Sequence, residues 1–353
     1  MVLNIINIPI IFTQSIISFF AYKINRYNNF VTSFGYVHNL NGFDLCIFSI
    51  VLKKEEGNRV EFCFNSDLAV EMKGSYSENE GEYSEEEIEN CTVCRLNISD
   101  ENLSKKYGRE AGKYTTVFCD NIFSMDRYTL ATTASIIAKE IENMLVGVVP
   151  NKKVCECKVL IVGLGNIEIT TDALGPLTVK NINVTRHIKI LKDELSSNTY
   201  VGEISAIAPG VLSQTGIETV EIVKAIASCI LPDVIIAVDS LAARNSERVG
   251  ATVQISDNGI SPGTGIGNYR KSINRHTVGC PVVAVGIPSV VASSLMVFDT
   301  LIAAGFEKID DTLVEKLKEK KNMYVTPKEC DEILRKSVEL LSMALNITFG
   351  LDS

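Results

Sequence analysis

From residue 154 onward, short apolar runs of strand length alternate with longer stretches in which apolar residues recur at helical spacing. Alternation of this kind predicts an α/β fold, a mostly parallel sheet with helices on both faces. The predicted strands are 158–162, 203–208, 233–238, 250–255 and 281–286, and the predicted helices are 173–183, 216–229, 289–303 and 327–346. Thr326 and Glu329 are placed to form a capping box for the last helix, with Pro327 in its first turn.

The preceding region predicts an α+β portion of the same domain. Strands are expected at 91–98 and 114–119, and a helix over 126–146, where apolar residues recur every three or four positions. Residues 74–90 are rich in Ser, Glu and Gly and predict an exposed loop. We therefore expect one domain over 66–353, with an N-terminal α+β portion (66–150) and an α/β core (151–353).

The first 59 residues form a doubtful N-terminal extension. Residues 2–22 carry no charge and have the length of a membrane-spanning helix, but Asn4, Asn7, Pro9 and Gln14 weaken that interpretation. Residues 54–57, Lys-Glu-Glu-Gly, can be encoded by a purine-rich ribosome-binding sequence, and Val60 follows at a spacing that suits a GTG start codon. We favour a start codon assigned too far upstream over a hydrophobic anchor, so a membrane is not expected as a partner.

Composition narrows the class of protein. The formal net charge of −9 argues against a surface that binds nucleic acid directly. Ten cysteines in 353 residues do not make a disulfide scaffold, and reduced thiols fit a cytoplasmic location. No histidine lies among acidic or cysteine neighbours that would suggest a metal ligand, so we expect neither a metal nor another cofactor.

Two aspartates follow apolar strands of the predicted core. Asp172 lies ten residues beyond strand 158–162, and Asp239 directly follows strand 233–238. Ligands of open α/β sheets bind outside the carboxyl ends of the strands, and two carboxyls there can act as acid and base on a water molecule. Each aspartate also has a structural alternative. Asp172 can cap the helix beginning at Ala173, whose N-terminus would lower its pKa, and Asp239 can be a buried structural residue.

The glycines of this region have two interpretations each. Gly163 and Gly165 resemble the start of a dinucleotide fingerprint, but Glu168 stands where the third glycine belongs, so plain turn glycines are favoured. The Gly-rich stretch 262–267 can present backbone N–H groups to an oxyanion or serve as an ordinary loop.

Several longer motifs occur in one order along the chain. They are Gly-Leu-Gly-Asn (163–166), Asp-Ala-Leu-Gly-Pro (172–176), Val-Thr-Arg-His (184–187), Ser-Ala-Ile-Ala-Pro-Gly-Val (205–211), Thr-Gly-Ile-Glu-Thr (215–219), Asp-Ser-Leu-Ala-Ala-Arg (239–244) and Gly-Thr-Gly-Ile-Gly-Asn (263–268). In these motifs the chain resembles the germination proteases of spore-forming bacteria, endopeptidases that degrade small acid-soluble spore proteins. The resemblance runs from about residue 66 to the C-terminal helix.

The resemblance implies a fold related to hydrogenase-maturation endopeptidases, an atypical aspartic peptidase activity and a homotetramer. It assigns Asp172 and Asp239 to the active site. Family substrates are cut after a glutamate, so Arg244 is a candidate anchor for that carboxylate, with Arg270 and Lys271 as further candidates. It also implies a zymogen whose leader, residues 60–65, is removed between Asn65 and Ser66.

Two other functions remain open from the sequence. A hydrogenase-maturation-like endopeptidase would need a metal and would make a single C-terminal cut. A non-catalytic binder of spore proteins would bind them without cleavage.

Overall fold

The computed structural model describes residues 6–9, 31–37, 45–51, 66–71, 83–107, 109–193, 202–263, 270–306, 311–319 and 323–351. The chain divides into two compact units, Met1–Glu61 and Phe62–Ser353. The first unit contains three antiparallel strands in the order β1–β3–β2, namely β1 (Ile6–Pro9), β2 (Val31–Val37) and β3 (Leu45–Val51). Most of the apolar run 2–22 lies outside the described residues. Within the described part of the chain, no helix is long and apolar enough to cross a membrane.

The second unit is built on a nine-stranded mixed sheet. Four neighbouring strands of this sheet, β8, β7, β9 and β11, pair in parallel with one another. The other pairings in the sheet are antiparallel. The strand order is β4–β5–β6–β10–β11–β9–β7–β8, with β12 beside β11. The strands are β4 (Tyr83–Ile88), β5 (Cys91–Ile98), β6 (Gly112–Cys119), β7 (Lys158–Gly163), β8 (Glu203–Ile207), β9 (Val234–Ala243), β10 (Thr252–Ser256), β11 (Val282–Ala292) and β12 (Tyr324–Val325).

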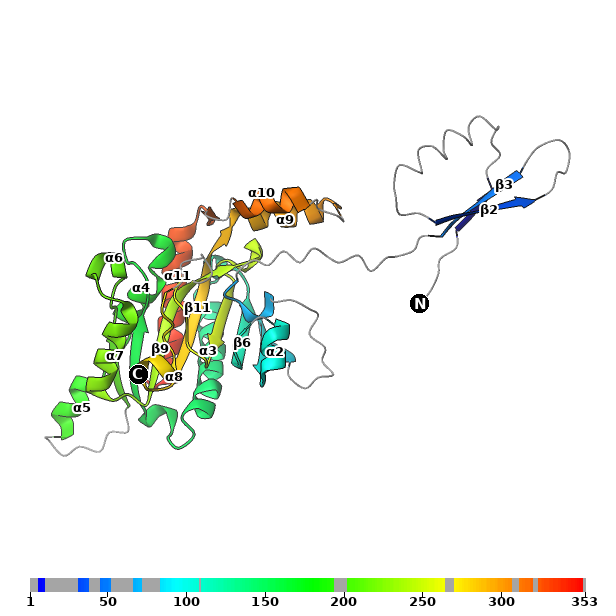
Figure 1. Ribbon diagram of the computed structural model, residues 1–353. Coiled ribbons are helices and arrows are strands. Elements are labelled where there is room, and N and C mark those ends of the chain that lie inside the picture. The colour runs from blue at the N-terminus through cyan, green and yellow to red at the C-terminus, as the bar shows by residue number, and fades with distance from the viewer. Residues whose placement is uncertain are drawn as a thin grey trace. The chain divides into compact units, whose positions relative to one another are not determined.

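Helices cover both faces of this sheet, as the α/β prediction requires. Alternate residues of β7 show this, because Val159 and Ile161 pack into one buried cluster and Leu160 and Val162 into another. The first cluster includes residues of α3 (Arg127–Val148), α4 (Leu174–Lys180) and α11 (Cys330–Thr348), and the second includes residues of α7 (Thr219–Ile230) and α8 (Arg275–Val278). Helices α3 and α11 lie side by side (Figure 1).

The remaining described helices are short and lie around this core. They are α2 (Glu101–Tyr107), α5 (Arg186–Asp193), α6 (Leu212–Thr215), α9 (Ser293–Ala303) and α10 (Asp311–Glu319). Every predicted strand and helix of 91–346 has an observed counterpart, with ends displaced by a few residues. The α/β fold is therefore confirmed, and the parallel pairing is confined to the half of the sheet that carries the two aspartates.

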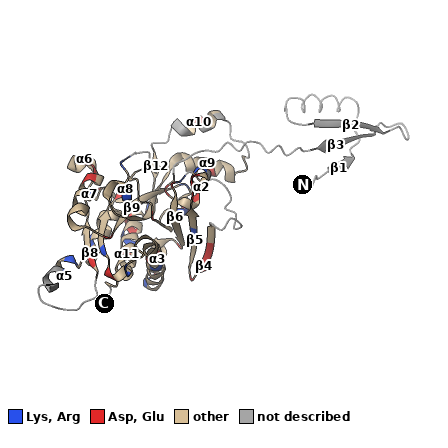
Figure 2. Cartoon of the chain, turned by 60° about the horizontal axis from the view of Figure 1, so that its bottom comes forward, with Lys and Arg blue, Asp and Glu red and all other residues tan. Residues whose placement is uncertain are grey.

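Three local predictions were wrong. Part of the predicted loop 74–90 forms the edge strand β4, whose exposed glutamates appear red in Figure 2. Charged side chains on an edge strand oppose pairing with another chain, so this composition suits an edge as well as a loop. Strand β11 continues to Ala292 through an irregularity after Pro288, which delays the next helix to Ser293. Helix α11 begins at Cys330 without a side-chain cap, because the Thr326 hydroxyl donates to the carbonyl of Ser289 at 2.9 Å.

Candidate active site

Strands β7 and β9 pair in parallel, with Gly163 beside Val238. Strand β7 ends there, and β9 continues along β11 to Ala243, so Asp239 lies inside β9, one residue beyond the end of β7. The chain then leaves β7 through a turn and a short 3-10 helix, Thr170–Asp172, before entering α4. Asp172 therefore follows the end of β7, whereas Asp239 lies inside β9 and not directly after a strand as the sequence predicted. Both lie toward the carboxyl ends of these parallel strands, where an open α/β sheet binds its ligands.

Glycines allow α4 to start directly against these strand ends. A Cβ atom on Gly175 would lie 2.3 Å from the carbonyl oxygen of Leu164 and 2.4 Å from that of Val238. A Cβ on Gly163 would lie 2.2 Å from the carbonyl oxygen of Gly175. Such contacts are too short for any side chain, so these two positions accept only glycine. The Gly163 of the motif thus serves close strand–helix packing.

The carboxylate of Asp172 is held by the turn that follows β7 and not by the N-terminus of α4. The N–H of Asn166 donates to its Oδ2 at 2.7 Å. Gly165 has φ +113°, and a Cβ there would lie 2.0 Å from the backbone oxygen of Asp172. The predicted helix cap was wrong, because Ala173 occupies the N-cap position of α4. The expected lowering of the pKa is also wrong: burial raises the pKa of Asp172, against the opposing effects of the Asn166 amide and Arg270.

Asp239 is the more buried of the two carboxyls, with 4% of its surface exposed. The N–H of Ser240 donates to its Oδ1 at 2.8 Å. Burial raises the pKa of Asp239 well above its usual value, and the negative charges of Asp172 and Asp67 raise it further. The site therefore holds a proton on Asp239 more readily than on Asp172, which has an amide donor and a cation to stabilise its charge.

Both aspartates face one cavity of about 400 Å³. Its walls come from the turn after β7, the α6–α7 region, the end of β9, the irregular part of β11 and the residues beside the Gly-rich stretch. Arg270 and Lys271 line it together with Asp172 and Asp239. A cavity of this size with convergent charged groups suits a peptide side chain and its scissile bond.

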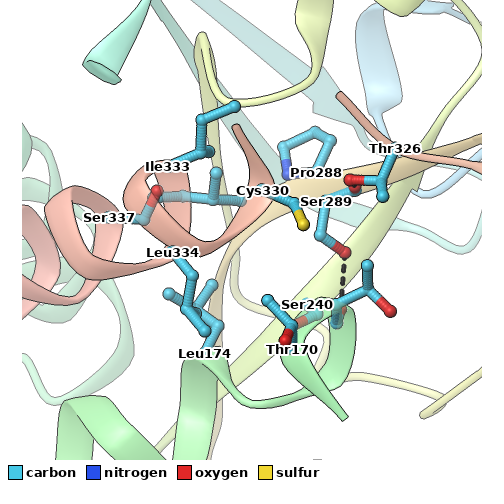
Figure 3. Close-up of a pocket in the computed structure, with 12 residues that line it drawn as sticks. Thr170, Leu174, Ser240, Pro288, Ser289, Thr326, Cys330, Ile333, Leu334 and Ser337 are labelled. Atoms are coloured by element: carbon cyan, nitrogen blue, oxygen red, sulfur yellow. Dashed lines mark hydrogen bonds between the residues drawn. The ribbon is translucent and has the colours of Figure 1, made fainter. Parts of the chain in front are cut away.

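A much smaller cavity of about 20 Å³ lies behind the turn that carries Asp172 (Figure 3). It is enclosed by that turn, by β11 and by the first turns of α11, which contribute Cys330 and Ser337. The Ser289 hydroxyl donates to the carbonyl of Thr171 at 2.6 Å, drawn as the dashed line from Ser289 in Figure 3. This bond ties the turn before Asp172 to the irregular part of β11.

The sequence of the chain matches the profile of the germination protease family over residues 65–321. The germination protease of Bacillus cytotoxicus is 41% identical over 258 residues, which cover 70% of this chain and 68% of the relative. That of Caldanaerobacter subterraneus subsp. tengcongensis is 36% identical over 307 residues, 80% of this chain and 93% of the relative. That of Clostridium tetani is 35% identical over 311 residues, which cover 80% of this chain and 94% of the relative.

The chain belongs to the germination protease family. Membership makes it a peptidase, and the resemblance drawn from the motifs is confirmed. The family match covers the two converging aspartates and the α/β unit up to residue 321, before β12 and α11. Among the described residues, no three His, Cys, Asp or Glu side chains lie close enough together to hold a metal ion.

The three cations predicted as substrate anchors lie in different places in this germination protease fold. Arg270 and Lys271 line the cavity, and Lys271 also lies 3.6 Å from Glu221. Arg244 follows β9 beyond the lining residues, close enough to Asp299 to oppose the rise in its pKa that burial causes. Residues 264–269 of the Gly-rich stretch lie outside the described residues, while Pro262 and Gly263 line the cavity.

Asp67 is a cavity residue that sequence reasoning missed. Its N–H donates to the carbonyl of Ala242 at 3.0 Å, and its Oδ2 accepts from the N–H of Ala242 at 2.8 Å. It therefore brings a third carboxylate beside the two aspartates. The neighbouring Ser66 is buried, and Asn65 lies outside the described residues. The pairing of Asp67 with β9 joins residues 175 positions apart, so no local pattern in the sequence indicates it.

Proposed function

We propose that this chain is the endopeptidase that begins the degradation of small acid-soluble spore proteins during germination, in the spore core. The observation that carries the proposal is the pair Asp172 and Asp239, which face one cavity with unequal burial. Two carboxyls with different surroundings can divide the roles of base and acid between them. The family membership supplies the class of reaction, and the proposal adds the substrate and the residues.

The proposed reaction uses one water molecule and no cofactor. Asp172, ionised, takes a proton from the water as its oxygen attacks the scissile carbonyl carbon. Asp239, protonated, donates to the carbonyl oxygen and stabilises the charge that develops there. When the C–N bond breaks, the proton held by Asp172 passes to the leaving nitrogen, and Asp239 recovers its proton as the new carboxyl group forms. Burial of Asp239 and the Arg270 charge near Asp172 support this division of roles.

Cations around the cavity would hold the glutamate on the amino side of the scissile bond. Arg270 and Lys271 line the cavity and are the direct candidates. Arg244 lies just past the end of β9, where it can meet a peptide that extends past Ala242. Guanidinium groups bind carboxylates in a two-pronged geometry, so the two arginines are favoured over Lys271.

We propose that the chain is made as a zymogen whose leader is removed close to Ser66. The predicted bond, between Asn65 and Ser66, has a buried residue on its carboxyl side. The bond between Asp67 and Leu68 is a second candidate for this cleavage, because Asp67 is an acidic residue held inside the cavity beside both aspartates. The intact N-terminal mass of the self-processed protein distinguishes a chain that begins at Ser66 from one that begins at Leu68.

Homotetramer assembly and the lack of direct nucleic-acid binding complete the proposal. The first follows the family resemblance, and the second follows the net negative charge of the chain. Sedimentation of the purified protein tests the first. Titration of the protein into labelled duplex DNA at low salt tests the second.

Incubation with a purified small acid-soluble spore protein tests the proposed activity. We expect a few internal cuts after glutamate residues, mapped by mass spectrometry, with no effect of a chelator. A single cut near the C-terminus of a hydrogenase large subunit, abolished by the chelator, would instead favour the hydrogenase-maturation type. Binding of the spore protein without any cleavage by the processed enzyme would favour a non-catalytic binder.

A further inference from the structure

The described segment 66–71 is built into the fold beside the active site. Leu68 and Ala69 are fully buried, and the N–H of Ala69 donates to the Oε1 of Gln254 at 2.9 Å. Leu68 packs in a cluster with Leu241 of β9 and Leu295 of α9. A segment with this packing is part of the mature core, whichever bond near Ser66 is cut.

Glu71 at the end of this segment caps the turn that follows β9. Its carboxylate accepts from the N–H of Arg244 at 2.7 Å and from the N–H of Asn245 at 2.9 Å. The Nε of Arg248 lies 3.1 Å from the same carboxylate, and the Ser66 hydroxyl also donates to it. Only 3% of the Glu71 side chain is exposed. A buried carboxylate satisfied by two backbone amides and one arginine holds this turn in a single position.

The turn follows directly on the part of β9 that lines the cavity. Four consecutive residues of the strand, 239–242, line it, and β9 ends at Ala243. Arg244 lies two residues beyond Ala242, so its backbone is within about 7 Å of the cavity wall. The backbone of Arg244 is therefore fixed by Glu71 at the point where the cavity wall ends.

We propose that Glu71 is a positioning residue of this peptidase, which sets where the Arg244 guanidinium meets an acidic side chain of the substrate. The inference rests on the proposed function, because it needs a substrate that carries a carboxylate near the scissile bond. Glu71 does not touch the substrate and acts through the backbone of Arg244. Glu71 thus belongs to the specificity apparatus, and the removable leader ends before it at either of the two proposed cleavage positions.

The test compares two peptides that differ only in Glu or Gln before the scissile bond. The ratio of their kcat/KM values measures recognition of the carboxylate. In Glu71→Gln, which keeps the size of the side chain and removes its charge, we expect this ratio to fall by about tenfold, mainly through KM. Glu71→Asp keeps the charge on a shorter side chain and should recover part of the ratio. Glu247→Gln removes an exposed carboxylate from the same turn and should leave the ratio unchanged.

A second comparison measures the effect of Glu71→Gln in a protein that already carries Arg244→Gln. If Glu71 acts through Arg244, Glu71→Gln has no further effect on the ratio in the Arg244→Gln background. An unchanged ratio in a Glu71→Gln protein with a normal melting transition would overturn the inference, and so would an equal fall in both backgrounds. Should Glu71→Gln fail to fold, the same comparisons apply to Glu71→Asp. Failure of the wild-type protein to cut either peptide would count against the proposed function, which keeps the two failures distinct.

Discussion

Two regions place aspartates at the same cavity by different physical means. One is the strand-end region, where β7 ends beside β9, and the other is segment 66–71. Asp172 and Asp239 are placed by parallel pairing of neighbouring strands and by glycine contacts between a strand and the next helix. Asp67 is placed by two hydrogen bonds to Ala242 and by the burial of Leu68, across more than 170 residues of chain. The first arrangement leaves a local pattern in the sequence. The second depends on tertiary packing, so it is recognised only when the fold is known.

The strand-end region is expected to be the more sensitive to a single methyl group. Gly175→Ala would place a Cβ 2.3 Å from the carbonyl oxygen of Leu164 and 2.4 Å from that of Val238, and both oxygens belong to backbone that cannot move freely. We expect a loss of about 2–4 kcal/mol in the free energy of unfolding and a fall in kcat of about 100-fold, because α4 and Asp172 must shift together. Urea denaturation and peptide hydrolysis measure the two effects. Gly147→Ala in helix α3 is the matched control, since a Cβ there meets nothing closer than 3.5 Å. We expect it to lower neither value, because alanine favours a helix over glycine.

Segment 66–71 should lose stability when its buried anchor is truncated. Leu68→Ala removes a fully buried side chain and leaves a cavity against Leu241 and Leu295, at a cost of about 2–5 kcal/mol in the free energy of unfolding. Urea denaturation measures this loss in the free energy of unfolding. Met323→Ala, at a side chain that is 62% exposed, should cost far less. Equal losses in the two variants would mean that segment 66–71 is not part of the core.

The charge of Arg270 helps Asp172 to serve as the base, because it stabilises the ionised form of that carboxyl. This charge lowers the pKa of Asp172 relative to what burial alone would give. Arg270→Gln should therefore raise the pKa of the base, so that the acid limb of kcat/KM moves to higher pH, with a fall of about tenfold for substrates with glutamate before the scissile bond. Lys271→Gln is the control, because Lys271 does not act on the pKa of Asp172. An unmoved acid limb in Arg270→Gln would argue that Asp172 is not the base.

Burial of Asp239 should also appear in the pH dependence of stability. Its pKa is raised in the folded protein, so the folded state keeps a proton that the unfolded state loses above about pH 4. Wild-type stability should therefore fall as pH rises from about 4 toward the pKa of the folded protein. In Asp239→Asn this fall in stability should be smaller, because the side chain at position 239 no longer titrates. Urea denaturation across this range measures it, and an identical pH dependence in both proteins would contradict the raised pKa.

The sequence predicted the elements that have strong local signals. Apolar runs identified the strands that flank the site, and helical spacing identified α3 and α11. It also identified Asp172 and Asp239, because each comes after a run of apolar residues, although the strand that holds Asp239 extends beyond it to Ala243. It could not separate a capping role for Asp172 from its observed bond to the Asn166 amide, since both suit an aspartate before a helix. It missed Asp67 and Glu71, whose partners lie more than 170 residues away.

The most direct test of the central claim compares wild type, Asp172→Asn and Asp239→Asn on one small acid-soluble spore protein, with and without a chelator. The account predicts that the wild type cuts the substrate equally well in both conditions. Each variant should lose at least about 100-fold in kcat while its melting transition is retained. Substantial cleavage by either folded variant, or loss of wild-type cleavage in the chelator, would contradict a reaction carried by these two aspartates.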